Sequence, residues 1–269
     1  MSPVSIQIDL RPFVHPHAAS TTNPILVLVG PSGEVSLSAP LGPVQLEPGA
    51  YQVIVGSGLV ADFTFTVTPQ GKVGFDPSFA SFLSGQGTST LVVNGFEITF
   101  DARYLSGPTT LFVLPDPFPV LNTKIRLLPA SSYQVEQGSG SVAQWKIKIG
   151  LDGKLHYDPT LDIAQNGFLA GNGTTTLQLF GYPLLVDARA SGAAAVVVVP
   201  TGNVTASTSD VTFVNVLPTD NVALQLDSKR LPFVLDFNGT FHVAPALAGV
   251  VRFDHFHGLA RKTVLRPLP

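Results

Sequence analysis

Hydrophobic and polar residues alternate one by one over many short stretches of this chain. Such a period of two places one set of side chains on a buried sheet face and the other set in water. The clearest apolar sets are Phe96, Ile98 and Phe100 in residues 96–103, and Ile6, Ile8 and Leu10 in residues 5–11. The chain also carries 25 Gly and 23 Pro, which leave little room for long helices. The pattern predicts an all-β protein.

Turn residues separate these extended stretches. Asp152-Gly153 and Asn238-Gly239 are strong signals for tight hairpins because the turn requires a positive φ, and Gln70-Gly71 occupies the corresponding place earlier in the chain. Asp76-Pro77 and Asp158-Pro159 follow the first two hairpins and predict turn initiation.

The chain repeats itself. Residues 133–159 match residues 51–77 at close to half of their positions without a gap, and residues 168–189 match residues 82–103 equally well. A third copy is weaker and is visible in residues 237–245, with Gly239 where the first copy has Gly71. Self-similarity at a fixed spacing indicates a protein built from tandem copies of one structural unit.

The strand that carries Asp-x-Arg is missing from the end of the third copy, but residues 5–11 at the N-terminus resemble it. The sequence therefore predicts ring closure, in which the N-terminal strand completes the last module and removes exposed sheet edges. We expect three tandem β modules in a closed pseudo-threefold arrangement, barrel-like or prism-like. Their predicted bounds are 22–107, 108–192, and 193–269 together with 1–21.

Composition narrows the classes of function. Hydrophobic residues make up 45% of the chain and charged residues 12%, with a net charge of −3 and no run of like charges. This argues against nucleic-acid binding, which needs a concentrated basic surface, and against a membrane partner. There is no cysteine, so disulfides and thiolate metal ligands are excluded. Residues 1–11 do not read as a signal peptide, so we expect a cytoplasmic location, with non-classical export as the alternative.

Asp-x-Arg is the most consistent polar feature of the repeats. Residues two apart on a strand face the same side, so each pair can form an ion pair. One reading is three like sites, or a single ring, that bind a polar ligand. The other is an ion pair or cap that holds neighbouring strands, and a feature kept in every copy favours this structural reading. The candidate binding residues are Asp9, Arg11, Asp101, Arg103, Asp187 and Arg189.

Histidine gathers in the third copy once the termini are joined. His15 and His17 flank a proline near the N-terminus, and His255 and His257 flank a phenylalanine near the C-terminus. Ring closure would bring the two pairs together, where neutral imidazoles could hold zinc or another divalent metal, or act as general acid and base. The alternative is a solvated loop and a strand edge with no cofactor.

Two functions follow from these features. The first is a non-catalytic binding or self-assembling β-repeat protein, whose partner is itself or a small apolar molecule, through a protein–protein surface or an apolar cavity. The second is a metal- or histidine-dependent hydrolase, lyase or isomerase that acts on a small apolar substrate, with its one site in the divergent third module.

Overall fold

The computed structural model describes residues 2–10, 26–37, 42–55, 59–106, 111–114, 118–120, 123–137, 145–189, 195–199, 202–207, 209–226, 229–243, 251–256 and 262–267. Over these ranges the chain is all-β, as the alternation predicts. The helices found there are short 3₁₀ turns, η1 (Pro77–Ser81), η2 (Pro159–Leu161) and η3 (Ile163–Gln165). No helix within the described ranges is long and apolar enough to cross a membrane.

A four-stranded sheet occurs three times with the same strand order. Its two central strands run parallel to each other, and each outer strand runs antiparallel to its neighbour. The first sheet has the order β4 (Pro43–Leu46), β1 (Val4–Asp9), β9 (Thr90–Val93), β8 (Leu83–Ser84). The second has the order β13 (Thr123–Leu127), β10 (Phe96–Asp101), β18 (Thr176–Leu179), β17 (Leu169–Ala170). The third has the order β22 (Thr212–Val216), β19 (Tyr182–Val186), β27 (Lys262–Pro267), β26 (Val251–Phe256).

Antiparallel strands also form a five-stranded arrangement three times. The first has the order β3 (Gly33–Leu37), β2 (Leu26–Gly30), β5 (Gly49–Val55), β6 (Leu59–Val67), β7 (Val73–Phe75). The second has the order β12 (Phe118–Val120), β11 (Leu111–Leu114), β14 (Ala130–Gln137), β15 (Trp145–Ile149), β16 (Leu155–Tyr157). The third has the order β21 (Gly202–Ala206), β20 (Ala195–Val199), β23 (Thr219–Leu226), β24 (Lys229–Leu235), β25 (Phe241–Val243). The first two are joined where β6 meets β14, at Ala61 and Ala130.

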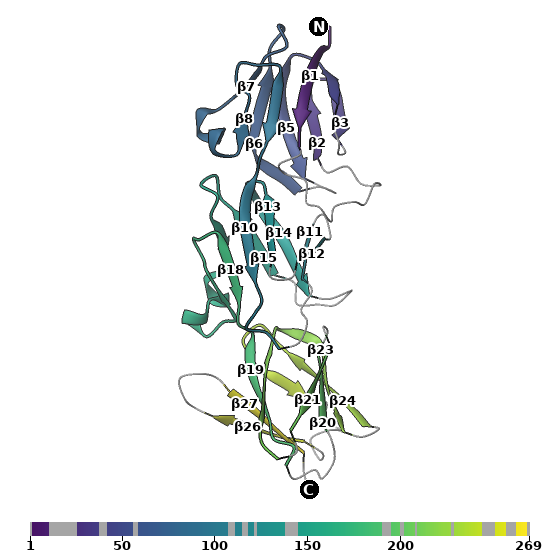
Figure 1. Ribbon diagram of the computed structural model, residues 1–269, viewed down its shortest axis with the longest axis vertical. Helices are drawn as coiled ribbons and strands as arrows, with labels where there is room; N and C mark the ends of the chain where they lie inside the picture. The colour runs from purple at the N-terminus through teal and green to yellow at the C-terminus, as the bar shows by residue number, and fades with distance from the viewer. Residues whose placement is uncertain are drawn as a thin grey trace.

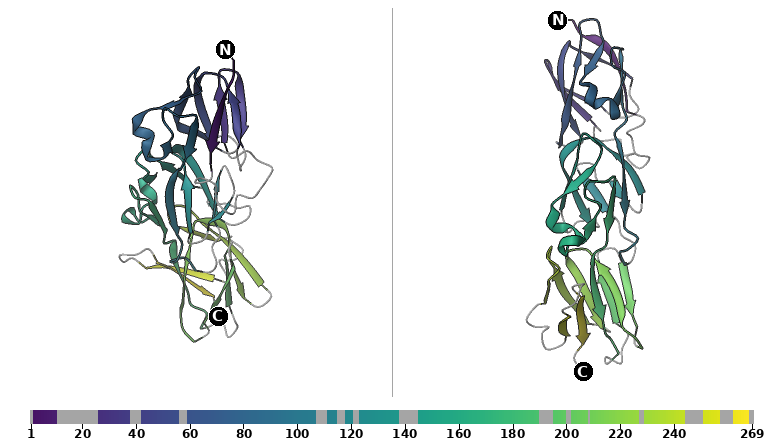
Figure 2. Two further views of the ribbon diagram at one scale, coloured as in Figure 1. Left: turned by 45° about the horizontal axis from the view of Figure 1, so that its top comes forward. Right: turned by 90° about the vertical axis from the view of Figure 1, so that its left-hand side faces the viewer.

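The strands fall into three consecutive groups: group I (β1–β9), group II (β10–β18) and group III (β19–β27). The groups follow one another along the long axis of the molecule (Figure 1), and the side view in Figure 2 shows the same succession. Within group I, one core joins Ile6 and Ile8 of the four-stranded sheet to Tyr51 and Phe65 of the five-stranded sheet. Each group is thus built of two facing sheets, and no sheet of described strands closes on itself.

The predicted ring closure is wrong. β1 pairs with β9 through Gln7 and Thr90 and with β4 through Val4 and Leu46, so the N-terminal strand completes group I. The third group has its own strand in that place, β19, paired with β22 and β27. The Asp-x-Arg strand therefore begins each group instead of ending it. It follows the last strand of the preceding group directly in sequence, so the repeated segments 82–103 and 168–189 each span the end of one group and the start of the next.

Burial follows the predicted alternation. Along β6, every second residue from Ala61 to Val67 is at most 3% exposed, while the residues between them face water. In β10, Ile98 and Phe100 are fully buried. Burial of each large apolar side chain stabilises the fold by about 1.5–3 kcal/mol, and this burial holds the two sheets of a group together.

The predicted turns are also present. Gly71, Gly153 and Gly239 have φ values of 69°, 76° and 80°, in the region that favours glycine. Asp76 and Asp158 begin the 3₁₀ turns η1 and η2, and each carboxylate accepts a hydrogen bond from a backbone N–H two residues on, at 2.9 Å.

Two residues connect each group to the next. Asn94-Gly95 joins β9 to β10, and Phe180-Gly181 joins β18 to β19. Gly95 and Gly181 have φ values of 61° and 67°. A Cβ on residue 181 would lie 2.8 Å from Leu105 Cδ2 and 2.9 Å from the carbonyl oxygen of Val216. Glycine at this junction therefore permits both the backbone conformation and the close approach of the two groups.

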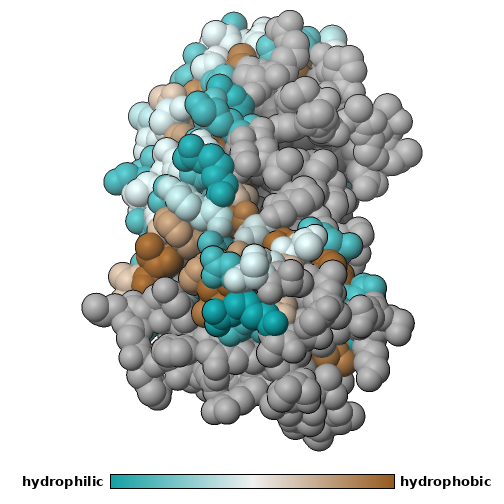
Figure 3. Space-filling view, turned by 60° about the horizontal axis from the view of Figure 1, so that its bottom comes forward, coloured by the Kyte–Doolittle hydropathy of each residue, from teal (hydrophilic) through white to brown (hydrophobic). Residues whose placement is uncertain are grey.

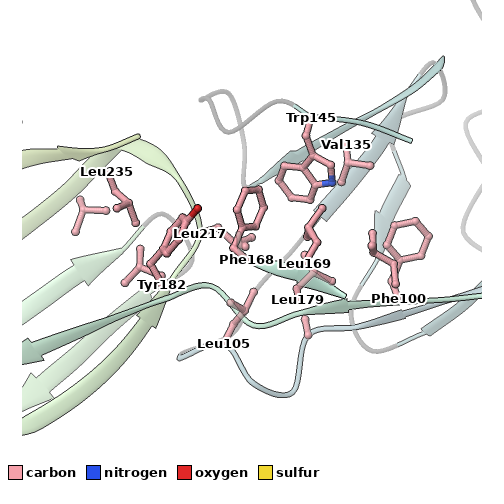
Figure 4. Packing of buried hydrophobic residues seen from close by; sticks show 14 of the residues in the cluster. Phe100, Leu105, Val135, Trp145, Phe168, Leu169, Leu179, Tyr182, Leu217 and Leu235 are labelled. Atoms are coloured by element: carbon pink, nitrogen blue, oxygen red, sulfur yellow. The ribbon is translucent and has the colours of Figure 1, made fainter. Parts of the chain in front are cut away.

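Aromatic side chains fill both junctions. The rings of Phe82 and Phe96 lie 5.3 Å apart between groups I and II, and those of Phe168 and Tyr182 lie 5.7 Å apart between groups II and III. The Tyr182 hydroxyl donates a hydrogen bond to the carbonyl oxygen of Phe237 at 2.7 Å. Figure 4 shows Tyr182 and Phe168 side by side in this packing. A continuous hydrophobic core therefore runs from group II into group III.

We predict that Gly181→Ala destabilises the protein by about 1–3 kcal/mol, because alanine must adopt a positive φ and contact Val216. Gly42→Ala is the matched control, since nothing lies within 4 Å of its Cβ position. Urea unfolding followed by circular dichroism measures both. Equal unfolding midpoints for the two variants would contradict the importance of this junction.

Candidate functional site

At the ends of β10 and β19, the arginine of each Asp-x-Arg motif makes two side-chain hydrogen bonds to the aspartate of the same motif. The Asp101 carboxylate accepts hydrogen bonds from Arg103 Nε at 2.8 Å and from Arg103 Nη2 at 2.7 Å. Asp187 accepts the same two from Arg189 at 2.8 Å and 2.9 Å. The backbone N–H of each arginine adds a third hydrogen bond to its aspartate, at 3.2 Å and 3.3 Å. Each motif thus fixes a tight turn.

The aspartates of these pairs are buried and their arginines are exposed. Asp101 is 6% exposed, whereas the Arg103 side chain is 70% exposed. The hydrogen bonds from Arg103 hold the pKa of Asp101 below its ordinary value, against the opposing effect of burial. A carboxylate with three such donors has little capacity left for a ligand, which supports the structural reading of the motif.

The first predicted pair is described only in part. Asp9 lies on β1, half-buried and opposite Val92 of β9, whereas Arg11 is outside the described residues. A single ring of all three pairs required the closed arrangement, so that hypothesis fails with the ring closure. Asp9, Asp101 and Asp187 lie instead at the ends of first strands in three separate sheets.

The turn at Asp101 leads the chain onto group III. Tyr104 stacks on Phe180, with ring centroids 4.3 Å apart and planes 14° apart. The Ser106 N–H donates to the carbonyl oxygen of Asn215 at 3.1 Å, and the Ser106 hydroxyl accepts from the Asn215 N–H at 2.9 Å. Asn215 Nδ2 also donates to the carbonyl oxygen of Tyr104 at 2.9 Å. The ion pair therefore positions the segment that contacts group III. This role could not be predicted from the sequence, because Asn215 lies more than a hundred residues away.

Of the four predicted histidines, the structure describes one in part. His15, His17 and His257 lie outside the described residues, and only the backbone of His255 is described, on β26 opposite Thr263. Across the described ranges, no group of three or more His, Cys, Asp or Glu residues could hold a metal ion. The metal or catalytic cluster stays a prediction.

One histidine with a defined partner is His242, on β25. Its Nε2 lies 2.8 Å from Asp236 Oδ2. Burial would raise the pKa of Asp236, but hydrogen bonds from His242 and from the N–H groups of Thr240 and Asn238 hold it below its ordinary value. The His242 side chain is 58% exposed, so the pair stabilises a surface turn.

The outer face of the four-stranded sheet differs between groups II and III. In group II, Glu97 and Thr99 are paired with Arg126 and Lys124, and Lys124 Nζ lies 2.8 Å from Glu97 Oε1. In group III, the corresponding positions hold Pro183 and Leu185, paired with Asn215 and Phe213. Phe213 is 56% exposed. At these four positions group II has Glu, Thr, Arg and Lys, and group III has Pro, Leu, Asn and Phe, so group III carries no charge there. Figure 3 shows hydrophobic side chains among polar ones on one face of the molecule.

No family model and no curated protein matches the chain.

We predict that Asp101→Asn lowers the free energy of unfolding by about 1–3 kcal/mol at pH 7, because the buried acceptor of Arg103 loses its charge. Glu97→Gln on the same strand is the matched control, since its partner Lys124 is exposed and the ion pair is at the surface. Urea unfolding at pH 7 distinguishes a large effect at residue 101 from none at residue 97. Equal losses in the free energy of unfolding would contradict the stabilising role of the Asp101–Arg103 ion pair.

We also predict that the stability difference between wild type and Asp101→Asn depends on pH. The folded-state pKa of Asp101 is lower than its ordinary value, so its contribution to stability is present above the unfolded pKa of about 3.9. That contribution is lost as the pH falls through the folded-state pKa. The stability difference between wild type and Asp101→Asn should therefore be constant from pH 7 to about pH 5 and shrink below about pH 3.9. A difference that grows in acid would overturn this assignment.

Proposed function

We propose that the chain is a non-catalytic, self-assembling β-repeat protein made of three tandem modules. The observation that carries this proposal is that the Asp-x-Arg side chains, the polar motif common to the repeats, bind each other within turns. Asp101–Arg103 and Asp187–Arg189 are taken up by the turns that end their strands, and the first of these turns leads into the contact with the next group. These charged residues therefore have a structural role, and the first pair positions the contact between two modules.

We place the module boundaries at the two-residue junctions, so that each module keeps one whole strand group. This shifts them from the predicted bounds of 22–107, 108–192, and 193–269 with 1–21, which relied on ring closure. The support is the set of contacts that repeat inside each group: Gly71 lies on Val4, Gly153 on Phe96, and Gly239 on Tyr182. In every case the hairpin glycine packs against the first strand of its own group.

A protein–protein surface is better supported than an apolar cavity. The space between the sheets is filled by large side chains such as Trp145 and Phe168, which are at most 3% exposed and pack edge to face at 5.5 Å (Figure 4). Apolar residues meanwhile lie on the outside of group III, where Phe213 is more than half exposed. Phe213 is paired with Leu185 on this outer face, and neighbouring apolar residues at the surface are typical of sites that bind other proteins.

We predict that native mass spectrometry of the full chain, purified without a histidine tag, detects a metal-free homo-oligomer. The mass reports subunit number, bound metal and retained small molecules in one measurement. A monomer with one divalent metal per chain would contradict the proposal and favour the His255 and His257 enzyme hypothesis. A metal-free monomer that carries a small molecule would instead support the binding-cavity version of the predicted function.

A further inference from the structure

The outermost strand of a sheet presents unpaired backbone groups, and the three five-stranded arrangements end on the same side in equivalent strands, β3, β12 and β21. Half of the N–H and C=O groups of such a strand point away from its neighbour and can pair with another strand. Natural proteins protect these edges with charged residues or proline.

Two of the three edges carry such protection. β3 contains the exposed Glu34, and β12 contains Pro119, which has no N–H to donate. β21 has the sequence Gly-Asn-Val-Thr-Ala, without a charged residue or a proline. The third group therefore exposes an edge that lacks the devices found on the other two.

The outer edge of β21 has no partner among the described strands. β21 forms a regular antiparallel ladder with β20, from Gly202 opposite Val199 to Ala206 opposite Ala195, and β20 is its one partner among the described strands. Asn203 and Thr205 are exposed on its outer face, and Val204 between them is half-buried. The ladder with β20 shows no register shift, and Val204 packs against the core of the group.

We propose that β21 pairs antiparallel with β21 of a second copy of this chain, which joins two five-stranded sheets into one. This inference rests on the proposed self-assembly and identifies β21 as the strand that joins two copies. A twofold axis at Val204 places Val204 opposite its own copy, Asn203 opposite Thr205 of the other copy, and Gly202 opposite Ala206. The outer face then pairs an amide with a hydroxyl, and the inner face pairs two valines.

A second copy fits this edge better than an unrelated segment. Because β21 carries no charge, two identical strands meet without like charges near each other. The chain also joins two of its own five-stranded arrangements already, at Ala61 and Ala130. A contact of one strand is small, so the dimer is expected to be weak, in the micromolar range.

The test is sedimentation velocity of the full chain over a series of concentrations. Wild type is expected to show a reversible monomer–dimer equilibrium. The double substitution Asn203→Lys with Thr205→Lys places lysines opposite each other twice across the twofold axis. It should raise the dissociation constant of the dimer at least about tenfold.

A charge exchange tests the register itself. Asn203→Lys with Thr205→Glu places Lys opposite Glu at both pairs, so this variant should dimerise again while the double-lysine variant does not. Ser36→Lys, at an exposed position of the β3 edge, is the matched control and should leave the equilibrium unchanged. Circular dichroism spectra establish that every variant is folded.

The outcomes separate this interface from the proposed function. If wild type self-associates and the double-lysine variant associates equally well, the β21 interface is wrong while self-assembly stands. If Ser36→Lys is as disruptive as the double-lysine variant, a different edge carries the contact. A wild type that stays monomeric at every concentration overturns both the interface and the self-assembly proposal.

Discussion

The arrangement of the whole chain depends on one contact, the parallel pairing of the first strand of each group with its last. Gln7 meets Thr90 in group I, Thr99 meets Thr176 in group II, and Leu184 meets Thr263 in group III. Parallel strands need a long crossover, and here the crossover is nearly the whole group. The pairing makes each group complete in itself, so the chain can pass to the next group through two residues. The glycine junctions, the aromatic contacts and the Asp101 turn all follow from that short passage.

Local features of the fold could be predicted from the sequence because they are set by neighbouring residues. The alternation around Phe100, the turn at Asp152-Gly153 and the capping role of Asp76 each depend on a few adjacent side chains. Ring closure was predicted wrongly because strand partners are set by contacts far apart in the chain. Residues 82–103 repeat as one block in the sequence, but Gly95 leads the chain out of one sheet and into the next within that block.

In the candidate site, too, local contacts could be predicted and contacts between distant residues could not. An ion pair at Asp101 and Arg103 could be predicted, since residues two apart share a side of the strand. Its consequence could not, because the partner of the following segment is Asn215, more than a hundred residues away. The unprotected edge at β21 was equally hidden: its composition is readable in the sequence, but its place as the outermost strand is a property of the topology.

The central claim is that three self-contained groups follow one another in a line instead of meeting around an axis. Small-angle X-ray scattering of the full chain, extrapolated to infinite dilution, tests it most directly. The linear arrangement predicts the skewed pair-distance distribution of an elongated particle, with a maximum dimension that matches the long axis in Figure 1. A symmetric, bell-shaped distribution from a compact particle would contradict it and restore the closed arrangement of the three groups.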